Sequence, residues 1–186
     1  MKVLRTIRKF RTVADLGKSI MTTAEEELTE LLANLPPGVK LVYKEGAWWR
    51  FCASFMTAIT FGSDRAFLNY TTTYWKTIAV PASWDLWTPE SKLETLVHEL
   101  VHVEQARKLS ILFWFLYILF PFPVGCAWFR YKFERDAYLA GYRVAVRYGQ
   151  DKAVLADEGA GLLSGASYGY AWPFRKKIYD WFMERL

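Results

Sequence analysis

The chain contains only two histidines, and they stand four residues apart in "VHELVHVEQ", residues 97 to 105. Side chains four apart lie on the same face of a helix, so the imidazoles of His98 and His102 can both reach one cation. Glu99 follows the first histidine and can reach a water molecule bound to that cation. This HExxH arrangement predicts a metal centre on a helix. The alternative is a pair of structural histidines on an ordinary helix.

A zinc ion held by two histidines needs a third protein ligand and one open position for water. No other histidine exists, and Cys52 and Cys126 form no CxxC pair, so we expect a carboxylate. The stretch "FERDAYLAGY" offers Glu134 and Asp136, which point about 200° apart on a helix. We favour Glu134, because small residues three and seven positions later let the histidine helix approach on that side. The alternative is an exposed Glu134 that pairs with a neighbour on the helix surface.

Hydrophobic periodicity, strand-forming residues and capping residues predict one α+β domain over residues 1–186, with about three or four strands. "AWWRFCASFMTAITFG" is rich in aromatic residues and threonine and predicts a strand, whereas "DEGAGLLSGASYGYAWPF" predicts a glycine-rich loop. The predicted elements are N-terminal helices (1–35), a sheet region (39–81), the helix with both histidines (89–109), an apolar hairpin (110–129), the helix with Glu134 (126–149), and a C-terminal loop and helix (150–186).

The apolar segment "SILFWFLYILFPFPVGCAWF", residues 110–129, is long enough to cross a membrane. A single crossing would separate His102 from Glu134 by about 30 Å of hydrocarbon, which is incompatible with one shared ion. Pro121, Pro123 and Gly125 favour a turn instead. We therefore expect a hairpin with both ends on one side, in contact with the domain, a protein partner, a second copy of the chain or one membrane leaflet.

The formal charge of +5, from 24 basic and 19 acidic residues, is too weak to indicate nucleic-acid binding without a recognisable motif. The N-terminal stretch "MKVLRTIRKFRTVADLGKSI" lacks the unbroken apolar run of a signal peptide. Two cysteines do not make a disulfide framework. We therefore expect a cytoplasmic protein that binds no nucleic acid.

"HELVHVEQ", followed by E-x-x-A from Glu134, resembles the gluzincin metallopeptidases, above all the minigluzincins and the HELxHVxQ metalloprotease-like domains. The resemblance covers residues 70–142. It implies a zincin-like fold, with a small, mostly antiparallel sheet packed on the histidine helix and the Glu134 helix, in which His98, His102 and Glu134 bind Zn2+. It also implies that Glu99 is the general base in hydrolysis of a peptide or protein substrate. An edge strand within "LNYTTTYWKTIAVP" would then hold that peptide in an extended form.

One position departs from the resemblance. Many gluzincins have an aspartate four residues after the ligand glutamate, and this chain has Tyr138 there. The aspartate orients the first histidine, so Asp136 or Glu94 is expected to orient His98 instead.

The resemblance also implies a donor that stabilises the oxyanion of the tetrahedral intermediate. Tyr168, Tyr170 and Arg175 in "SGASYGYAWPFR" are the candidates, and we nominate Tyr170 as a catalytic residue. A second hypothesis from another class is a structural or interaction protein that retains the zincin fold and its zinc site. HELxHVxQ domains occur among phage and contractile-injection proteins, so the resemblance also allows a virion-associated role. A third hypothesis, an integral membrane protease, depends on residues 110–129.

Overall fold

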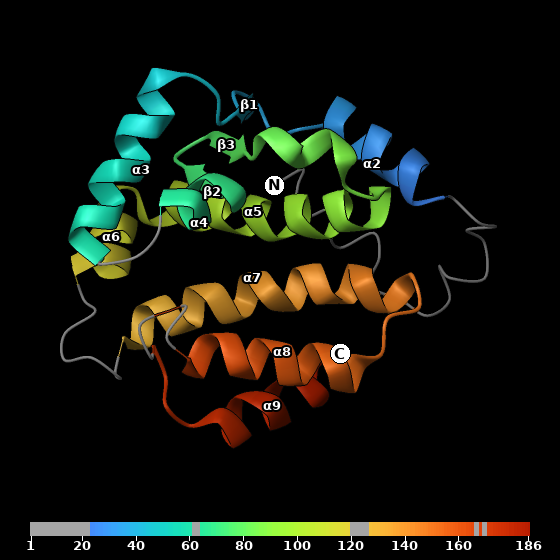
Figure 1. The fold of residues 1–186 in the computed structure, drawn as a ribbon. Coiled ribbons are helices and arrows are strands. Elements are labelled where there is room, and N and C mark those ends of the chain that lie inside the picture. The colour runs from blue at the N-terminus through green and yellow to red at the C-terminus, as the bar shows by residue number, and fades with distance from the viewer. Residues whose placement is uncertain (1–22, 61–63, 120–126, 166–167, 169–170) are drawn as a thin grey trace. The chain divides into compact units, whose positions relative to one another are not determined.

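Figure 1 shows the computed structural model, which describes residues 23–60, 64–119, 127–165, 168 and 171–186. The fold is mixed α+β, as the sequence predicts. Contacts between Cα atoms divide the chain into two compact units. The first comprises Met1–Thr72 and Lys76–Leu93, and the second comprises Thr73–Trp75 and Glu94–Leu186. The part of the N-terminal prediction that covers residues 1–22 lies outside the described residues.

Helix α2 (Ala24–Ala33) is the first described element. Its capping box is present: the Glu26 backbone N–H donates to Thr23 Oγ1, and the Thr23 N–H donates to the Glu26 carboxylate. These bonds satisfy N–H groups that have no partner inside the helix, so the sequence prediction of this helix start is confirmed.

Residues Ala47–Thr60 form helix α3, which contacts helix α4 (Asp64–Asn69). The prediction of a strand over this stretch is therefore wrong. Trp49, Cys52 and Ala53 lie three and four residues apart and are buried or half-buried, which is a helical pattern. Aromatic residues favour strands only where they pack on a pleated surface, and here the helical spacing prevails.

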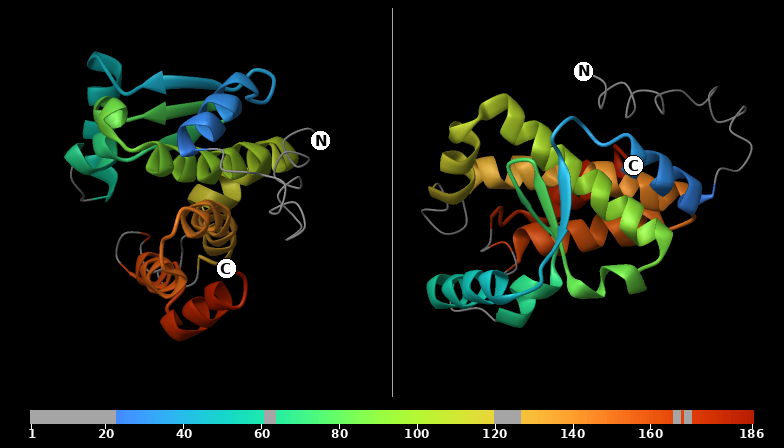
Figure 2. Two further views of the ribbon diagram at one scale, coloured as in Figure 1. Left: turned by 90° about the vertical axis from the view of Figure 1, so that its right-hand side faces the viewer. Right: turned by 90° about the horizontal axis from the view of Figure 1, so that it is seen from above.

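The three strands are β1 (Lys40–Tyr43), β2 (Thr72–Tyr74) and β3 (Thr77–Val80), in the order β1-β3-β2. Strand β1 runs parallel to β3, as the two arrows in the left view of Figure 2 show. The sheet is therefore mixed, and the expectation of a mostly antiparallel sheet is wrong for β1. A parallel pair needs a connection of a dozen residues or more, and α3 and α4 lie in that connection.

Lys44 follows β1 and is a buried lysine. Its ammonium group donates to the carbonyl oxygens of Phe67 at 2.8 Å and Tyr70 at 2.6 Å, and to Thr72 Oγ1 at 2.6 Å. These three bonds satisfy the buried charge and fix the chain just before β2.

After β3, the 3₁₀ helix η2 (Ala82–Leu86) leads into helix α5 (Pro89–Leu109). The Oγ1 of Thr88 accepts a hydrogen bond from the Ser91 N–H at 3.3 Å, which caps the first turn. The helix predicted over residues 89–109 is confirmed, because proline suits the first turn and the cap residue precedes it.

The apolar segment begins with helix α6 (Ile111–Trp114) and the π-helical turn η3 (Phe115–Leu119). The expected turn at Pro121, Pro123 and Gly125 lies outside the described residues, so the hairpin stays a prediction. Within the described part of the chain, no helix combines the length and the apolar character needed to cross a membrane.

Three helices complete the second unit: α7 (Trp128–Arg147), α8 (Lys152–Ser164) and α9 (Arg175–Met183). Helix α8 packs against both α7 and α9 (Figure 1). The glycine-rich loop predicted from Asp157 onward is therefore wrong up to Ser164. Asp151 caps the start of α8, because its carboxylate accepts hydrogen bonds from the N–H groups of two residues in the first turn.

Glycine in α8 serves close packing. A Cβ atom on Gly159 would lie 2.8 Å from Phe182 Cε2 and 2.9 Å from Tyr142 Cε2, so neither ring leaves room for a side chain. The buried core around this point is formed by Ala127, Tyr131, Tyr142, Ala145, Leu155, Ala156, Ala160, Leu163, Ala171, Ile178 and Phe182.

Candidate metal centre

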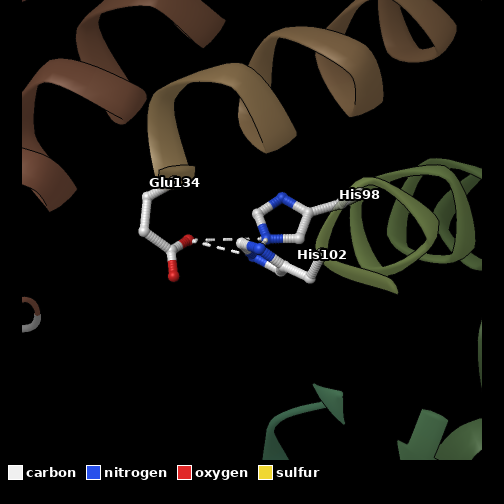
Figure 3. Close-up of side chains that lie close together, drawn as sticks. All are labelled: His98, His102 and Glu134. Atoms are coloured by element: carbon white, nitrogen blue, oxygen red, sulfur yellow. Dashed lines mark hydrogen bonds and ion pairs between the residues drawn. The ribbon is translucent and has the colours of Figure 1, made fainter. Parts of the chain in front are cut away.

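Helix α5 presents His98 and His102, and helix α7 presents Glu134, so that the three side chains point toward one another (Figure 3). The Nε2 atoms of the two histidines lie 3.1 Å apart. Oε2 of Glu134 lies 3.6 Å from Nε2 of His98 and 3.5 Å from Nε2 of His102. The structure therefore brings together the three residues that the sequence predicts as ligands.

These distances suit one metal ion. In the plane of the three atoms, the point equidistant from all of them lies about 2.0 Å from each, close to the zinc–nitrogen and zinc–oxygen bond lengths of roughly 2.0–2.2 Å. Ideal tetrahedral ligands at such bond lengths are about 3.4 Å apart, and the three measured separations fall on either side of that value. The residues present therefore fit a tetrahedral ion with one position left over.

The choice between the two candidate carboxylates is decided by their burial. Glu134 has 2% of its side chain exposed, whereas Asp136 has 52% exposed and pairs with Arg135. Ala137 is fully buried on the Glu134 side, and a Cβ on Gly141 would lie 3.1 Å from the Glu94 carbonyl oxygen. These small residues let α7 approach α5 closely, which is the arrangement that the sequence predicts.

The two oxygens of Glu134 have different surroundings. Oε1 accepts a hydrogen bond from the hydroxyl of Tyr117 in η3. Oε2, which faces the histidines, is buried and has no hydrogen-bond partner among the described residues. A buried carboxylate oxygen without a partner is costly, and a cation shared with two imidazoles would remove that cost.

His102 is oriented by Gln105, one turn further along α5. Nδ1 of His102 lies 2.9 Å from Oε1 of Gln105, and Nε2 of Gln105 donates to the backbone carbonyl of Phe133 at 3.0 Å. Because the amide nitrogen of Gln105 donates to Phe133, the amide oxygen of Gln105 is the atom that faces His102. This oxygen accepts a hydrogen bond, so Nδ1 of His102 carries the proton. That tautomer leaves the lone pair on Nε2 for a metal.

The surroundings of His98 differ from those of His102. The ring of Tyr138 meets the ring of His98 edge-on, with centroids 4.6 Å apart. Neither carboxylate expected to orient this histidine bonds to it within the described residues: Asp136 pairs with Arg135, and Glu94 makes no hydrogen bond to His98. Tyr138 therefore holds the ring by packing rather than by hydrogen bonding.

The charges of the cluster are strongly coupled. Burial is the largest single influence on the pKa of His102 and acts to lower it. The Glu134 carboxylate, together with smaller contributions from Glu99 and Gln105, outweighs burial and raises that pKa from 6.5 to about 9. Burial acts to raise the pKa of Glu134, and the attraction of the histidines, His102 foremost, holds it well below 4.5. Without a metal, a proton on His102 therefore neutralises the buried carboxylate at neutral pH.

Glu99 lies on α5 next to His98 and is 6% exposed. Its Oε2 accepts a hydrogen bond of 2.6 Å from Oγ1 of Thr73 in β2. This bond fixes one carboxylate oxygen and leaves the other as a base. Glu99 is not one of the three residues whose donor atoms converge.

No protein-family model, curated protein or solved structure matches this chain. The interpretation of the site therefore depends on its residues and their geometry.

The tyrosines around the cluster form a second layer. The hydroxyls of Tyr138 and Tyr168 lie 2.9 Å apart, and the guanidinium of Arg130 lies 5.3 Å from the ring centres of both Tyr117 and Tyr168. Tyr170, the residue nominated as oxyanion donor, lies outside the described residues.

Arg175, the third candidate for this role, begins α9 and pairs with Asp157 at 2.9 Å. The guanidinium of Arg175 thus forms an ion pair with the Asp157 carboxylate of α8. Of the two oxyanion candidates that the structure describes, Tyr168 lies beside Tyr138 and Arg130.

Sequence reasoning missed three residues that hold the site: Thr73, Gln105 and Tyr117. Gln105 could have been found, because it stands three residues after His102 and therefore faces the same side of the helix. Thr73 and Tyr117 lie 26 and 17 residues from their partners, and no local spacing indicates those contacts.

Proposed function

We propose that the chain is a zinc-dependent metallopeptidase of gluzincin type with a zincin-like fold. The observation that carries this proposal is the convergence of two imidazole nitrogens and one buried carboxylate oxygen, which has no hydrogen bond among the described residues, on a point about 2.0 Å from each. A carboxylate base adjacent to the first histidine, held by Thr73, supports hydrolysis over purely structural metal binding.

In this proposal His98, His102 and Glu134 hold the zinc ion. The bound ion supplies Lewis acidity, which lowers the pKa of a water molecule and polarises the substrate carbonyl. Glu99 would accept a proton from the attacking water molecule through the oxygen that Thr73 leaves unbound, and would then pass it to the leaving amine. Gln105 keeps the His102 imidazole in the tautomer that has its lone pair on Nε2.

The substrate class follows from the edge of the sheet. Strand β2 is last in the order β1-β3-β2, and within the described residues only β3 pairs with it. An extended peptide can add to such an edge by backbone hydrogen bonds. Thr73 belongs to β2 and contacts Glu99, so a peptide on this strand would pass beside the general base.

A second candidate function is a zinc-binding interaction protein that has lost or never used the peptidase chemistry. The observation that favours it is the exposed apolar surface of the segment after α5, where Ile111 is 71%, Leu112 48% and Phe115 46% exposed. Apolar side chains grouped in this way are typical of contact sites for a protein or a membrane surface.

The exchange of Glu99 for Gln separates the two candidates. Glu99→Gln should retain zinc and lose hydrolysis of a peptide library by about 10²–10⁴-fold, because the base does not ligate the ion. Glu104→Gln is the matched control: it makes the same chemical change on the same helix, at a residue whose carboxylate pairs with Arg107. Parent-like cleavage by Glu99→Gln would refute the mechanism, and zinc binding without cleavage in the unchanged protein would favour the interaction protein.

A further inference from the structure

Both carboxylate oxygens of Glu134 are buried. With 2% of the side chain exposed, neither oxygen is solvated by bulk water. Each oxygen therefore needs a donor or a cation. Oε2 faces the two histidine nitrogens, whereas Oε1 accepts from the Tyr117 hydroxyl.

Tyr117 is itself held firmly. Its ring centre lies 5.5 Å from that of Phe113 and 6.1 Å from that of His102, and the Arg130 guanidinium lies 5.3 Å from it on the ring face. The residue stands in the π-helical turn η3, a backbone form that is rare and occurs frequently at functional sites. Packing therefore fixes the direction in which the hydroxyl donates.

A carboxylate ligand can bind zinc through one oxygen or through both. Binding through both would occupy the position that a hydrolytic site keeps for water. An oxygen that already accepts a strong hydrogen bond from a phenol is less available to the metal.

We propose that Tyr117 is a positioning residue that engages Oε1 of Glu134, restricts this carboxylate to ligation through Oε2 and so keeps the fourth coordination position open for water. This inference rests on the proposed zinc site. Tyr117 lies between the two ligand helices in the sequence. The spacing of residues along the chain does not indicate this role for it.

The test compares Tyr117→Phe with Tyr142→Phe in the full chain. Both changes remove one buried hydroxyl and keep the ring, but Tyr142 lies in the helical core and its hydroxyl has no hydrogen-bond partner among the described residues. Cobalt(II) replaces zinc as the probe, because four-coordinate cobalt absorbs visible light more strongly than five-coordinate cobalt. Chelator competition measures zinc affinity in parallel.

Tyr117→Phe should weaken the visible cobalt bands and lower zinc affinity by about 10- to 100-fold, while Tyr142→Phe should keep both properties of the parent. Equal effects in the two variants would overturn the proposal, as would a Tyr117→Phe protein that matches the parent. A phenolate-to-metal charge-transfer band in the copper(II)-loaded parent that disappears in Tyr117→Phe would show that Tyr117 is a ligand, and would also overturn it.

X-ray absorption of the zinc-loaded parent gives a second measurement that needs no variant. Four nitrogen or oxygen neighbours support the proposal, and five neighbours with a two-oxygen carboxylate contradict it. If the parent protein binds neither zinc nor cobalt, the proposed metal site is wrong. If the parent binds the metal and Tyr117→Phe behaves in the same way, only the proposed role of Tyr117 is wrong.

Discussion

Zinc binding to this site should depend strongly on pH, because a proton and the metal compete for Nε2 of His102. Burial acts to lower the pKa of His102, but Glu134, Glu99 and Gln105 together raise it to about 9 in the metal-free protein, and Glu134 is the largest of the three. Only the neutral imidazole can ligate zinc. At pH 7, below that pKa, most molecules carry a proton on both nitrogens of His102, so the apparent zinc affinity lies well below its limiting value.

The sign of the effect is fixed by the direction of the shift. A raised pKa protonates His102 throughout the neutral range, so zinc affinity should rise by up to about tenfold per pH unit above pH 6, more slowly as the pH nears 9, and level off above it. Calorimetry in buffers of different ionisation enthalpy should also detect the release of about one proton per zinc bound at pH 7.

Two variants sharpen this prediction. Glu134→Gln removes the charge that raises the pKa of His102, so the bend in the affinity profile should move to lower pH. Asp136→Asn is the matched control, because Asp136 is exposed and pairs with Arg135. An affinity that stays constant between pH 6 and 9, or a bend that stays at 9 in Glu134→Gln, would refute the reasoning.

Two further predictions concern the ligand carboxylate and the helical core. Glu134→Ala should lower zinc affinity in a chelator competition far more than Asp136→Ala, because only Glu134 faces the histidines; equal losses would remove the assignment. Gly159→Ala should destabilise the chain by about 1–2 kcal/mol in urea unfolding, since overpacking against Phe182 exceeds the gain in helix propensity. Gly161→Ala in the same helix meets only Arg175, at 3.8 Å, and should stabilise by up to about 1 kcal/mol; the same sign for both changes would contradict the packing account.

The helices that carry the candidate ligands could be predicted from the sequence, because their signals are local. The cap at Thr88 and the proline after it mark the start of α5, and helical spacing places His98 and His102 on one face. The same spacing selects Glu134 over Asp136. The helical period alone therefore predicts which of these side chains point in the same direction.

The errors arose where composition and periodicity conflict. The stretch that forms α3 has the aromatic content of a strand, yet its buried positions at Trp49, Cys52 and Ala53 follow a helical period. The stretch that forms α8 has the glycine content of a loop, yet Gly159 is required there by the rings of Tyr142 and Phe182. Neither ring lies close to Gly159 in the sequence, so the requirement for glycine at this position is seen only in the packed structure.

The supporting contacts of the site depend on tertiary structure. Thr73 reaches Glu99 across 26 residues, and Tyr117 reaches Glu134 across 17 residues through a π-helical turn. A sequence pattern predicts which side chains share one face of a helix. It does not predict which residues of another helix or strand pack against that face.

The central claim is that His98, His102 and Glu134 hold one metal ion. Elemental analysis of protein purified without chelator tests it most directly, in the parent and in His98→Ala. We predict about one zinc per chain in the parent and none above background in His98→Ala, with the variant still folded by circular dichroism. A folded parent without metal, or a His98→Ala protein that retains the full zinc content, would contradict the account.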